Sequence, residues 1–116
     1  MEEKTGMTNP AETVNEDMAR AKLALAAAAY AFGAPLDAVA AERRGGRRDV
    51  TRVRQVAMYL AHVGFGMNLA RVAMAFGRDR STAAYACHKI EDERDDPALD
   101  AQLDALEDCL RAAPAP

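Results

Sequence analysis

The sequence predicts an all-α protein, a compact helical bundle that contains a helix-turn-helix. Three observations lead to this prediction. The 116-residue chain is rich in alanine, leucine, arginine and acidic residues, a composition that favours helix. Apolar residues recur at spacings of three and four through most of the chain, and most glycines and prolines fall between these periodic segments. Half of the residues are apolar, which is enough for one modest core.

Domain organisation follows from where the apolar periodicity begins. Residues 1–15 contain threonine, glycine, proline and acids without periodicity, and we expect a disordered acidic tail. One folded domain should occupy residues 16–112, and residues 113–116 should form a short disordered end. The first helix is expected from Glu16 to near Gly33.

A second short helix, LDAVAAERR, is predicted after Pro35 and should stop at Gly45-Gly46. This opening pair of helices has no functional signature, and we interpret it as scaffold. The segment from Arg43 to Arg54 that follows contains six arginines and one acid. It starts as a glycine-interrupted loop, which is suited to the minor groove of DNA; the alternative is a solvated basic loop.

The next helix is predicted from Thr51 to about Val63. Its core stripe comprises Val53, Val56, Ala57, Leu60 and Val63, which leaves Arg52, Gln55, Tyr59 and His62 on or near the other side. The start of this helix should therefore expose Arg54 and Gln55 to DNA phosphates.

Two short helices joined by a glycine turn are predicted between Asn68 and Glu91, in the sequence NLARVAMAFGRDRSTAAYACHKIE. Asn68 is a plausible N-cap, and Gly77 falls at the bend, where a positive φ is needed. The inner face of the first helix should carry Leu69, Val72, Ala73 and Phe76. Arg71 lies outside it, either at a phosphate or in solvent.

The second helix of this pair is the predicted recognition helix. Asp79 is expected either to cap it or to contact a base. Arg80, Ser81 and Thr82 occupy its first turn, where such helices meet base edges, and an arginine there can bind guanine bidentately. Its buried side should carry Ala83, Ala86, Cys87 and Ile90.

A final helix should begin at Pro97, with Leu99, Leu103, Leu106 and Leu110 on one stripe. The stripe serves either the core of this chain or the docking of a partner. No membrane span, metal-type cysteine or histidine spacing, cofactor motif or catalytic constellation is present in the sequence, so we expect neither an enzyme nor a metal or small-molecule site.

Charge is distributed unevenly along the chain. The net charge is −3 overall, but residues 18–90 carry +8, whereas residues 1–17 carry −4 and residues 91–116 carry −7. A basic middle between acidic ends favours a phosphate-bearing partner, with ends that suppress indiscriminate binding. The alternative is an ordinary solvated surface.

Three stretches carry a family resemblance: RVRQVAMYLA from Arg52, AFGRDRST from Ala75 and ACHKIE from Ala86. They resemble the C-terminal DNA-binding domain (domain IV) of the bacterial replication initiator DnaA, whose signature reads RPRQ-(I/M)-AM, FGGRDHTTV and AC-x-KIE. The likeness runs from about Arg20 to Arg94, and no phosphate-loop motif of the initiator's nucleotide-binding part is present. We therefore expect a stand-alone homologue of that domain.

The resemblance implies roles for particular residues. An arginine corresponding to Arg48, or Arg47 beside it, would enter the minor groove, and Asp79, Arg80, Ser81 and Thr82 would meet bases. The expected phosphate contacts are Arg47, Arg52, Arg54, Gln55, Arg71, Arg78 and Lys89. Arg80 stands where the family has histidine, Ser81-Thr82 replaces Thr-Thr, and one glycine replaces two, so a DNA site distinct from the initiator's box is expected.

Three functions follow from these observations. The first is a cytoplasmic, nucleoid-associated transcription regulator of double-stranded DNA. Within that class the chain resembles the DNA-binding half of gene-transfer-agent activators of α-proteobacteria, which implies a separate sigma-factor-like partner and contact with RNA polymerase. The second is a replication regulator that competes with the initiator, and the third is an interaction adaptor with vestigial DNA binding.

Overall fold

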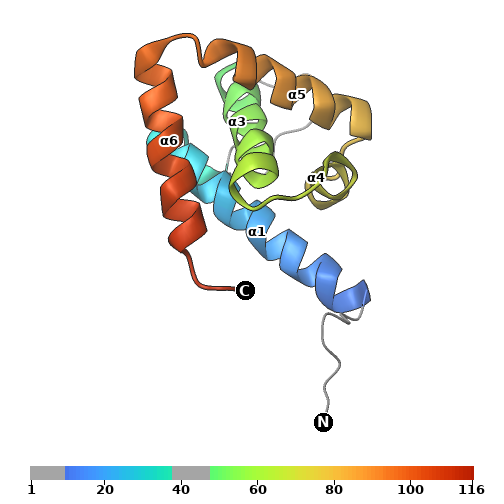
Figure 1. The fold of residues 1–116 in the computed structure, drawn as a ribbon. Helices are drawn as coiled ribbons and strands as arrows, with labels where there is room; N and C mark the ends of the chain where they lie inside the picture. Colours follow the sequence, from blue (N-terminus) through green and yellow to red (C-terminus); the bar gives the residue numbers. More distant parts are fainter. Residues whose placement is uncertain (1–9, 38–47) are drawn as a thin grey trace.

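The computed structural model describes residues 10–37 and 48–116 of the chain. Within these ranges lie five α-helices and no strand. They are α1 (Pro10–Ala31), α3 (Arg48–Gly64), α4 (Leu69–Phe76), α5 (Arg80–Glu93) and α6 (Pro97–Ala112). The all-α helical bundle that the sequence predicts is thereby confirmed (Figure 1).

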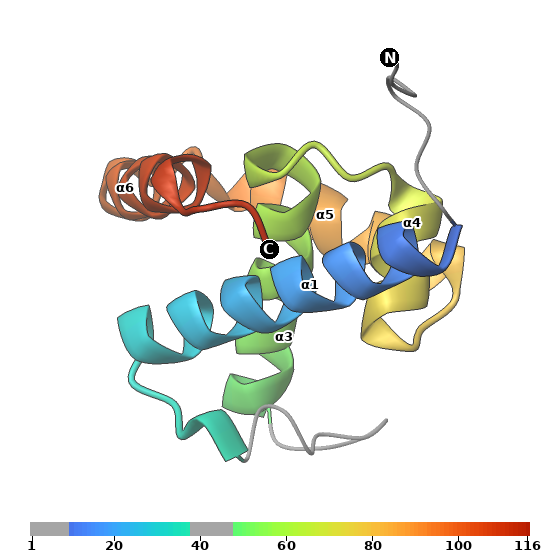
Figure 2. The same ribbon diagram turned by 90° about the horizontal axis from the view of Figure 1, so that it is seen from below.

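Helix α3 occupies the centre of the bundle and packs against all four of the other helices. Helix α1 crosses it on one side and also contacts α4 and α6, while α5 covers α3 and α4 together. Helices α4 and α6 lie on opposite sides of α3 (Figures 1 and 2). The α4–α5 pair therefore projects from one side of the bundle with its outer surface uncovered.

The centre of α3 is buried all round. Every residue from Val56 to Ala61 is at most 3% exposed. A helix hydrophobic on all faces is stable in water only when other helices surround it. Tyr59, which the apolar stripe places on the outer side, is consequently buried, and that expectation was wrong. Its hydroxyl donates to Glu91 Oε1 at 2.6 Å, because α5 covers this face as well.

Two helices begin earlier than the sequence predicts. Helix α1 starts at Pro10 rather than Glu16, so residues 10–15 are helical where a disordered tail was expected. Proline fits the first turn of a helix, and buried Asp17 fixes the early part of α1 to α4, which local periodicity does not reveal. Helix α3 starts at Arg48 instead of Thr51. Of the predicted second helix, Leu36 and Asp37 are helical, and the rest lies outside the described residues.

Helix α6 folds back on its own bundle. Leu99, Leu103 and Leu110 are buried, and Leu106 packs partly buried against the core. The leucine stripe is therefore part of the core. No helix in the described ranges is long and apolar enough to cross a lipid bilayer.

Arg94, at the end of α5, joins three helices through its guanidinium. It forms ion pairs with Asp100 at 2.6 Å and with Asp104 and Glu107, all on α6. It also donates to the Tyr59 hydroxyl at 3.0 Å and lies 5.9 Å from the centre of that ring. Burial, together with the Glu91 hydrogen bond, raises the pKa of Tyr59 to about 12, so the phenol stays protonated.

Replacing Arg94 with alanine should destabilise the fold by about 2–4 kcal/mol, because it leaves Glu107, whose side chain is 10% exposed, without its nearly buried partner. Chemical denaturation at pH 7 measures this loss. Arg111→Ala is the matched control, because Arg111 pairs with the same Glu107 from a side chain that is 52% exposed. The control should cost less than about 0.5 kcal/mol. Equal losses in the two variants would contradict a structural role specific to Arg94.

Candidate nucleic-acid interface

The turn between α4 and α5 is closed by local hydrogen bonds. Asn68 caps α4 by accepting the Arg71 backbone N–H at 2.9 Å. At the other end Gly77 adopts φ 66° and ψ 35°, in the left-handed region. The Arg78 N–H then donates to the Ala73 carbonyl at 2.9 Å, and the Gly77 N–H donates to Met74 at 3.2 Å. This pair of bonds is a Schellman motif, which ends α4 at the glycine as predicted.

Helix α5 begins immediately after this turn, with Asp79 as its N-cap. Asp79 Oδ1 accepts the Thr82 backbone N–H at 2.8 Å and the Ser81 hydroxyl at 2.9 Å. Of the two roles considered for Asp79, the capping role is therefore present in the structure. Arg78 is the single residue between the glycine of one helix end and the cap of the next, which leaves the turn little freedom.

The first turn of α5 is exposed, and the opposite face is core. Arg80, Ser81 and Thr82 are all exposed. The buried side consists of the four residues that the sequence predicts, Ala83, Ala86, Cys87 and Ile90. Burial raises the pKa of the Cys87 thiol to about 11, so this cysteine is a small packed side chain at neutral pH.

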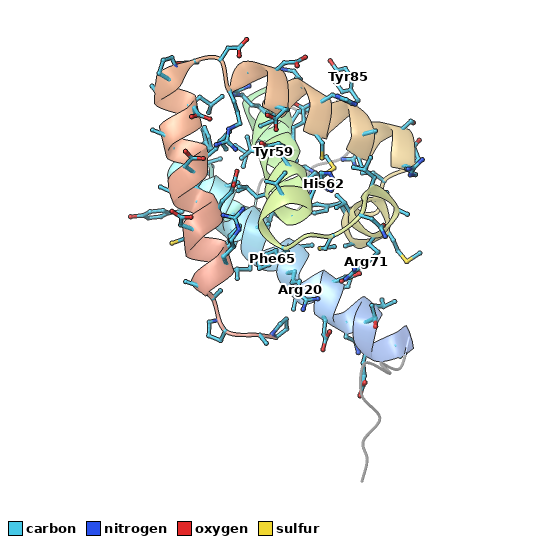
Figure 3. All side chains as sticks on the ribbon, viewed as in Figure 1. Arg20, Tyr59, His62, Phe65, Arg71 and Tyr85 are labelled. Atoms are coloured by element: carbon cyan, nitrogen blue, oxygen red, sulfur yellow. The ribbon has the colours of Figure 1, made fainter. Side chains whose placement is uncertain are left out.

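Two further residues, which were not among those predicted from the sequence, extend the exposed face of α5. Tyr85 is 63% exposed and points away from the bundle (Figure 3). His88 is exposed one turn further on. Both share a face with Ser81, because residues four and seven positions along a helix return to the same side. This spacing from Ser81 is the feature of the sequence from which the two residues could have been predicted.

Arg54 is not at the surface, contrary to the sequence prediction of a phosphate contact. The residue is 8% exposed, and its Nη2 donates to the Phe76 carbonyl at 3.3 Å. Its guanidinium also lies 6.0 Å from the centre of the Phe76 ring. A cation at the carbonyl end of α4 is favourable for the helix dipole. Arg54 therefore braces the turn of the helix-turn-helix from within.

Arg71 forms an ion pair with a buried acid of α1. Its Nε and Nη2 donate to the two carboxylate oxygens of Asp17 at 2.9 and 2.6 Å, which connects α4 to α1 (Figure 3). The Arg71 hydrogen bond holds the pKa of Asp17 below its ordinary value, while Asp17 raises the pKa of Arg71. Asp17 is thus the partner of this guanidinium in the unbound protein, and the Arg71 side chain is still 40% exposed, so its phosphate contact stays a prediction.

Arg52 and Lys89 come together through Glu93. Arg52 Nη1 pairs with one carboxylate oxygen, and Lys89 Nζ lies 2.6 Å from the other. Their side chains are 37% and 36% exposed, so both predicted phosphate contacts remain at the surface. Hydrogen bonds from Lys89 and Arg52 keep the pKa of Glu93 below its usual range, so the carboxylate is ionised at neutral pH.

The remaining predicted contacts are placed as follows. Arg48 is the first residue of α3 and therefore belongs to a helix rather than to a loop, and Arg47 lies outside the described residues. Gln55 and Arg78 are half-buried. Among the described residues, no three histidine, cysteine or acidic side chains are arranged to hold a metal ion.

In this protein two helices are joined by a tight turn at a glycine in the left-handed conformation, and the second helix presents polar residues from its first turn. This arrangement defines a helix-turn-helix protein. Residues 25–90 match the family model of the bacterial DnaA helix-turn-helix. The match covers more than half of the 116 residues, and the chain belongs to this family. The family is one of DNA-binding, non-catalytic domains.

Individual relatives agree with this assignment. The chromosomal replication initiator protein DnaA of Laribacter hongkongensis is 42% identical over 66 residues, which are 55% of this chain and 14% of that protein. The initiator proteins DnaA 2 of Chlamydia trachomatis and Chlamydia muridarum are each 42% identical over 52 residues, or 45% of this chain and 11% of theirs. The chain thus spans about one seventh or less of these relatives.

The capping role of Asp79 can be tested with two variants. Asp79→Ala should lower the free energy of unfolding by about 1 kcal/mol, because the first turn of α5 loses its acceptor. Asp79→Asn should stay close to the wild type, because asparagine caps as well as aspartate. Thermal denaturation compares the three proteins. Full stability of Asp79→Ala would show that the cap is dispensable.

Arg71→Ala should lower stability by about 1–3 kcal/mol, because Asp17 is left buried without its bidentate partner. In the wild type this contribution is present above the ordinary Asp17 pKa of 3.8 and is lost as the pH falls through the lower folded value. The variant's deficit should therefore shrink on acidification, which denaturation at pH 7 and pH 3 tests. Adding Asp17→Asn to the variant should restore part of the stability. A deficit that stays constant with pH would contradict the role of this pair.

Proposed function

We propose that the protein is a sequence-specific transcription regulator that binds double-stranded DNA with α5 in the major groove. The observation that carries the proposal is the exposed first turn of α5, with Arg80, Ser81 and Thr82 on a rigidly capped helix. In helix-turn-helix proteins this part of the second helix meets base edges. Asp79 lies beside these three side chains and completes the proposed base-contacting set.

We propose that Arg80 makes the DNA site of this protein differ from the initiator's box. It stands where the family has histidine, and an arginine binds guanine O6 and N7 bidentately, with roughly 1–3 kcal/mol of discrimination. Tyr85 and His88 continue the same exposed face and are proposed to lengthen the contact along the groove. These differences support a DNA site other than the initiator's own box.

The proposed contacts with the DNA backbone come from residues around the first turn of α5. Arg52, Gln55 and Lys89 keep surface exposure, and Arg78 lies directly before α5. We retain these four as phosphate contacts together with Arg71, whose side chain is 40% exposed beside its Asp17 pair, and remove Arg54, whose guanidinium is used inside the protein. Arg48, with Arg47 beside it, remains the proposal for the minor groove. The +8 charge of residues 18–90 supplies the attraction for the DNA backbone.

The finer part of the proposal concerns the genes that are regulated. By analogy with gene-transfer-agent activators, we propose activation of a phage-like or gene-transfer-agent cluster in the nucleoid, together with a sigma-factor-like partner and RNA polymerase. The leucine stripe of α6 does not supply the partner surface, since it belongs to the core. The support for this part is the family analogy.

A second candidate is a replication regulator that competes with the initiator for origin boxes. The features that favour it are Arg48, Asp79 and Thr82, which correspond to residues of the family pattern. Arg80 and the shortened glycine turn count against it, because they change the side chains and the setting of the reading helix.

A genome-wide occupancy map, made by immunoprecipitation of the tagged chain and of the cell's own initiator, tests the proposal. We expect peaks at a few promoters, with a shared motif unlike the initiator box and no enrichment at the origin. Peaks that coincide with those of the initiator would instead establish the replication regulator. An absence of discrete peaks would contradict both and favour an adaptor.

The same map with Arg80→His links the motif to α5. Restoring the family's histidine removes the bidentate guanine contact, so occupancy should fall at the wild-type promoters and rise at sites resembling the initiator box. Arg111→His is the matched control and should leave the map unchanged, because Arg111 belongs to α6, which lies on the opposite side of α3 from α4 (Figure 1). An unaltered motif in Arg80→His would exclude Arg80 from base reading.

A further inference from the structure

Glu93 holds two cations that belong to different helices. Arg52, in the first turns of α3, and Lys89, one turn before Glu93 on α5, each bind one oxygen of its carboxylate. The Glu93 side chain is 29% exposed, so this three-residue cluster lies at the surface rather than in the core. Its exposure leaves both cations within reach of an incoming anion.

A DNA phosphate and a carboxylate offer these cations the same kind of partner, an anionic oxygen. Arg52 and Lys89 are both proposed backbone contacts, so the approaching phosphates and Glu93 would claim the same donors. The carboxylate also stays ionised at neutral pH, since its pKa is held low by Lys89 and Arg52. Two like charges at one pair of cations repel each other, so the binding of either one weakens the binding of the other.

We infer that Glu93 is an internal competitor of the DNA backbone, which occupies Arg52 and Lys89 in the unbound protein and yields them when DNA binds. The inference rests on the proposed DNA-binding function and adds a residue that tunes it. Phosphate contacts carry no base information, so this competition weakens binding to every duplex by a similar factor. Glu93 thus tunes the affinity and the salt dependence of DNA binding, while α5 determines which DNA sequence is bound.

The cluster also explains how a chain with a basic middle can avoid indiscriminate binding. A single carboxylate cancels part of the charge of two contacts at the place where phosphate would bind. More distant acids act only through a field that salt screens within about 10 Å. The effect of Glu93 should therefore persist at ionic strengths that screen the more distant acids.

Glu93→Gln tests the inference in fluorescence-anisotropy titrations with a labelled duplex. The variant should bind roughly 3- to 10-fold more tightly at moderate salt, because glutamine keeps the shape and removes the competing charge. The slope of log K against log salt should become more negative by up to about one unit, because the wild-type Glu93 carboxylate takes up a salt cation when it yields its partners and glutamine does not. Random and selected duplexes should gain similarly.

The matched control is Asp92→Asn, an exposed acid next to Glu93 that undergoes the same change of net charge. It should alter affinity by less than half as much on a logarithmic scale, because Asp92 does not take part in the Arg52–Glu93–Lys89 contacts. In a background with Arg52→Gln and Lys89→Gln, Glu93→Gln should gain nothing, since no cation remains to release.

The outcomes are distinguishable from failure of the proposed function. If the wild type binds duplex DNA and Glu93→Gln binds equally well or more weakly at unchanged melting temperature, the competitor role is overturned. Weaker binding would mean that Glu93 positions the two cations instead. Equal gains from Glu93→Gln and Asp92→Asn would also overturn it, in favour of net charge alone. If the wild type binds no duplex at all, the proposed function itself fails.

Discussion

Burial of α3 on every side is the constraint on which the other helices depend. Residues 56–61 leave no face for water, so α1, α4, α5 and α6 must all cover this one helix. Each fully buried large side chain among them contributes roughly 1.5–3 kcal/mol, and polar groups can remain only where a partner meets them. Tyr59 is such a case, since Glu91 and Arg94 satisfy its hydroxyl. The recognition helix is thus fixed by the same contacts that make the core.

The basic middle of the chain serves two separate purposes. Part of its positive charge is structural, because Arg54 braces the turn after α4 and Arg71 binds Asp17 across to α1. Another part is available to a partner, with Arg80 exposed at the start of α5. Counting charges along the sequence cannot separate these groups, because both raise the same total. The separation depends on which guanidinium groups meet a buried acceptor, and only the fold determines this.

Features set by neighbouring residues were predictable from the sequence, and features set by distant partners were not. The caps Asn68, Gly77 and Asp79 bond within three to five residues of themselves, so spacing alone located α4 and α5. The Arg71–Asp17 pair joins positions 54 apart, and the Arg54 bond spans 22. No local pattern indicates such partners. The early start of α1 has the same cause, because Asp17 anchors a segment that lacks strong periodicity of its own.

The single glycine of the turn limits how far the reading helix can depart from the family's geometry. Gly77 completes a Schellman motif at the end of α4, and Asp79 caps the start of α5 after one intervening residue. Every residue of the turn therefore takes part in one of the two capping motifs. Arg54 also holds the end of α4, because its guanidinium donates to the Phe76 carbonyl. A turn held by two caps and a buried cation cannot adjust gradually to a different groove. In the proposed function, a DNA site other than the initiator's box would therefore come from the setting of α5 together with its exposed side chains.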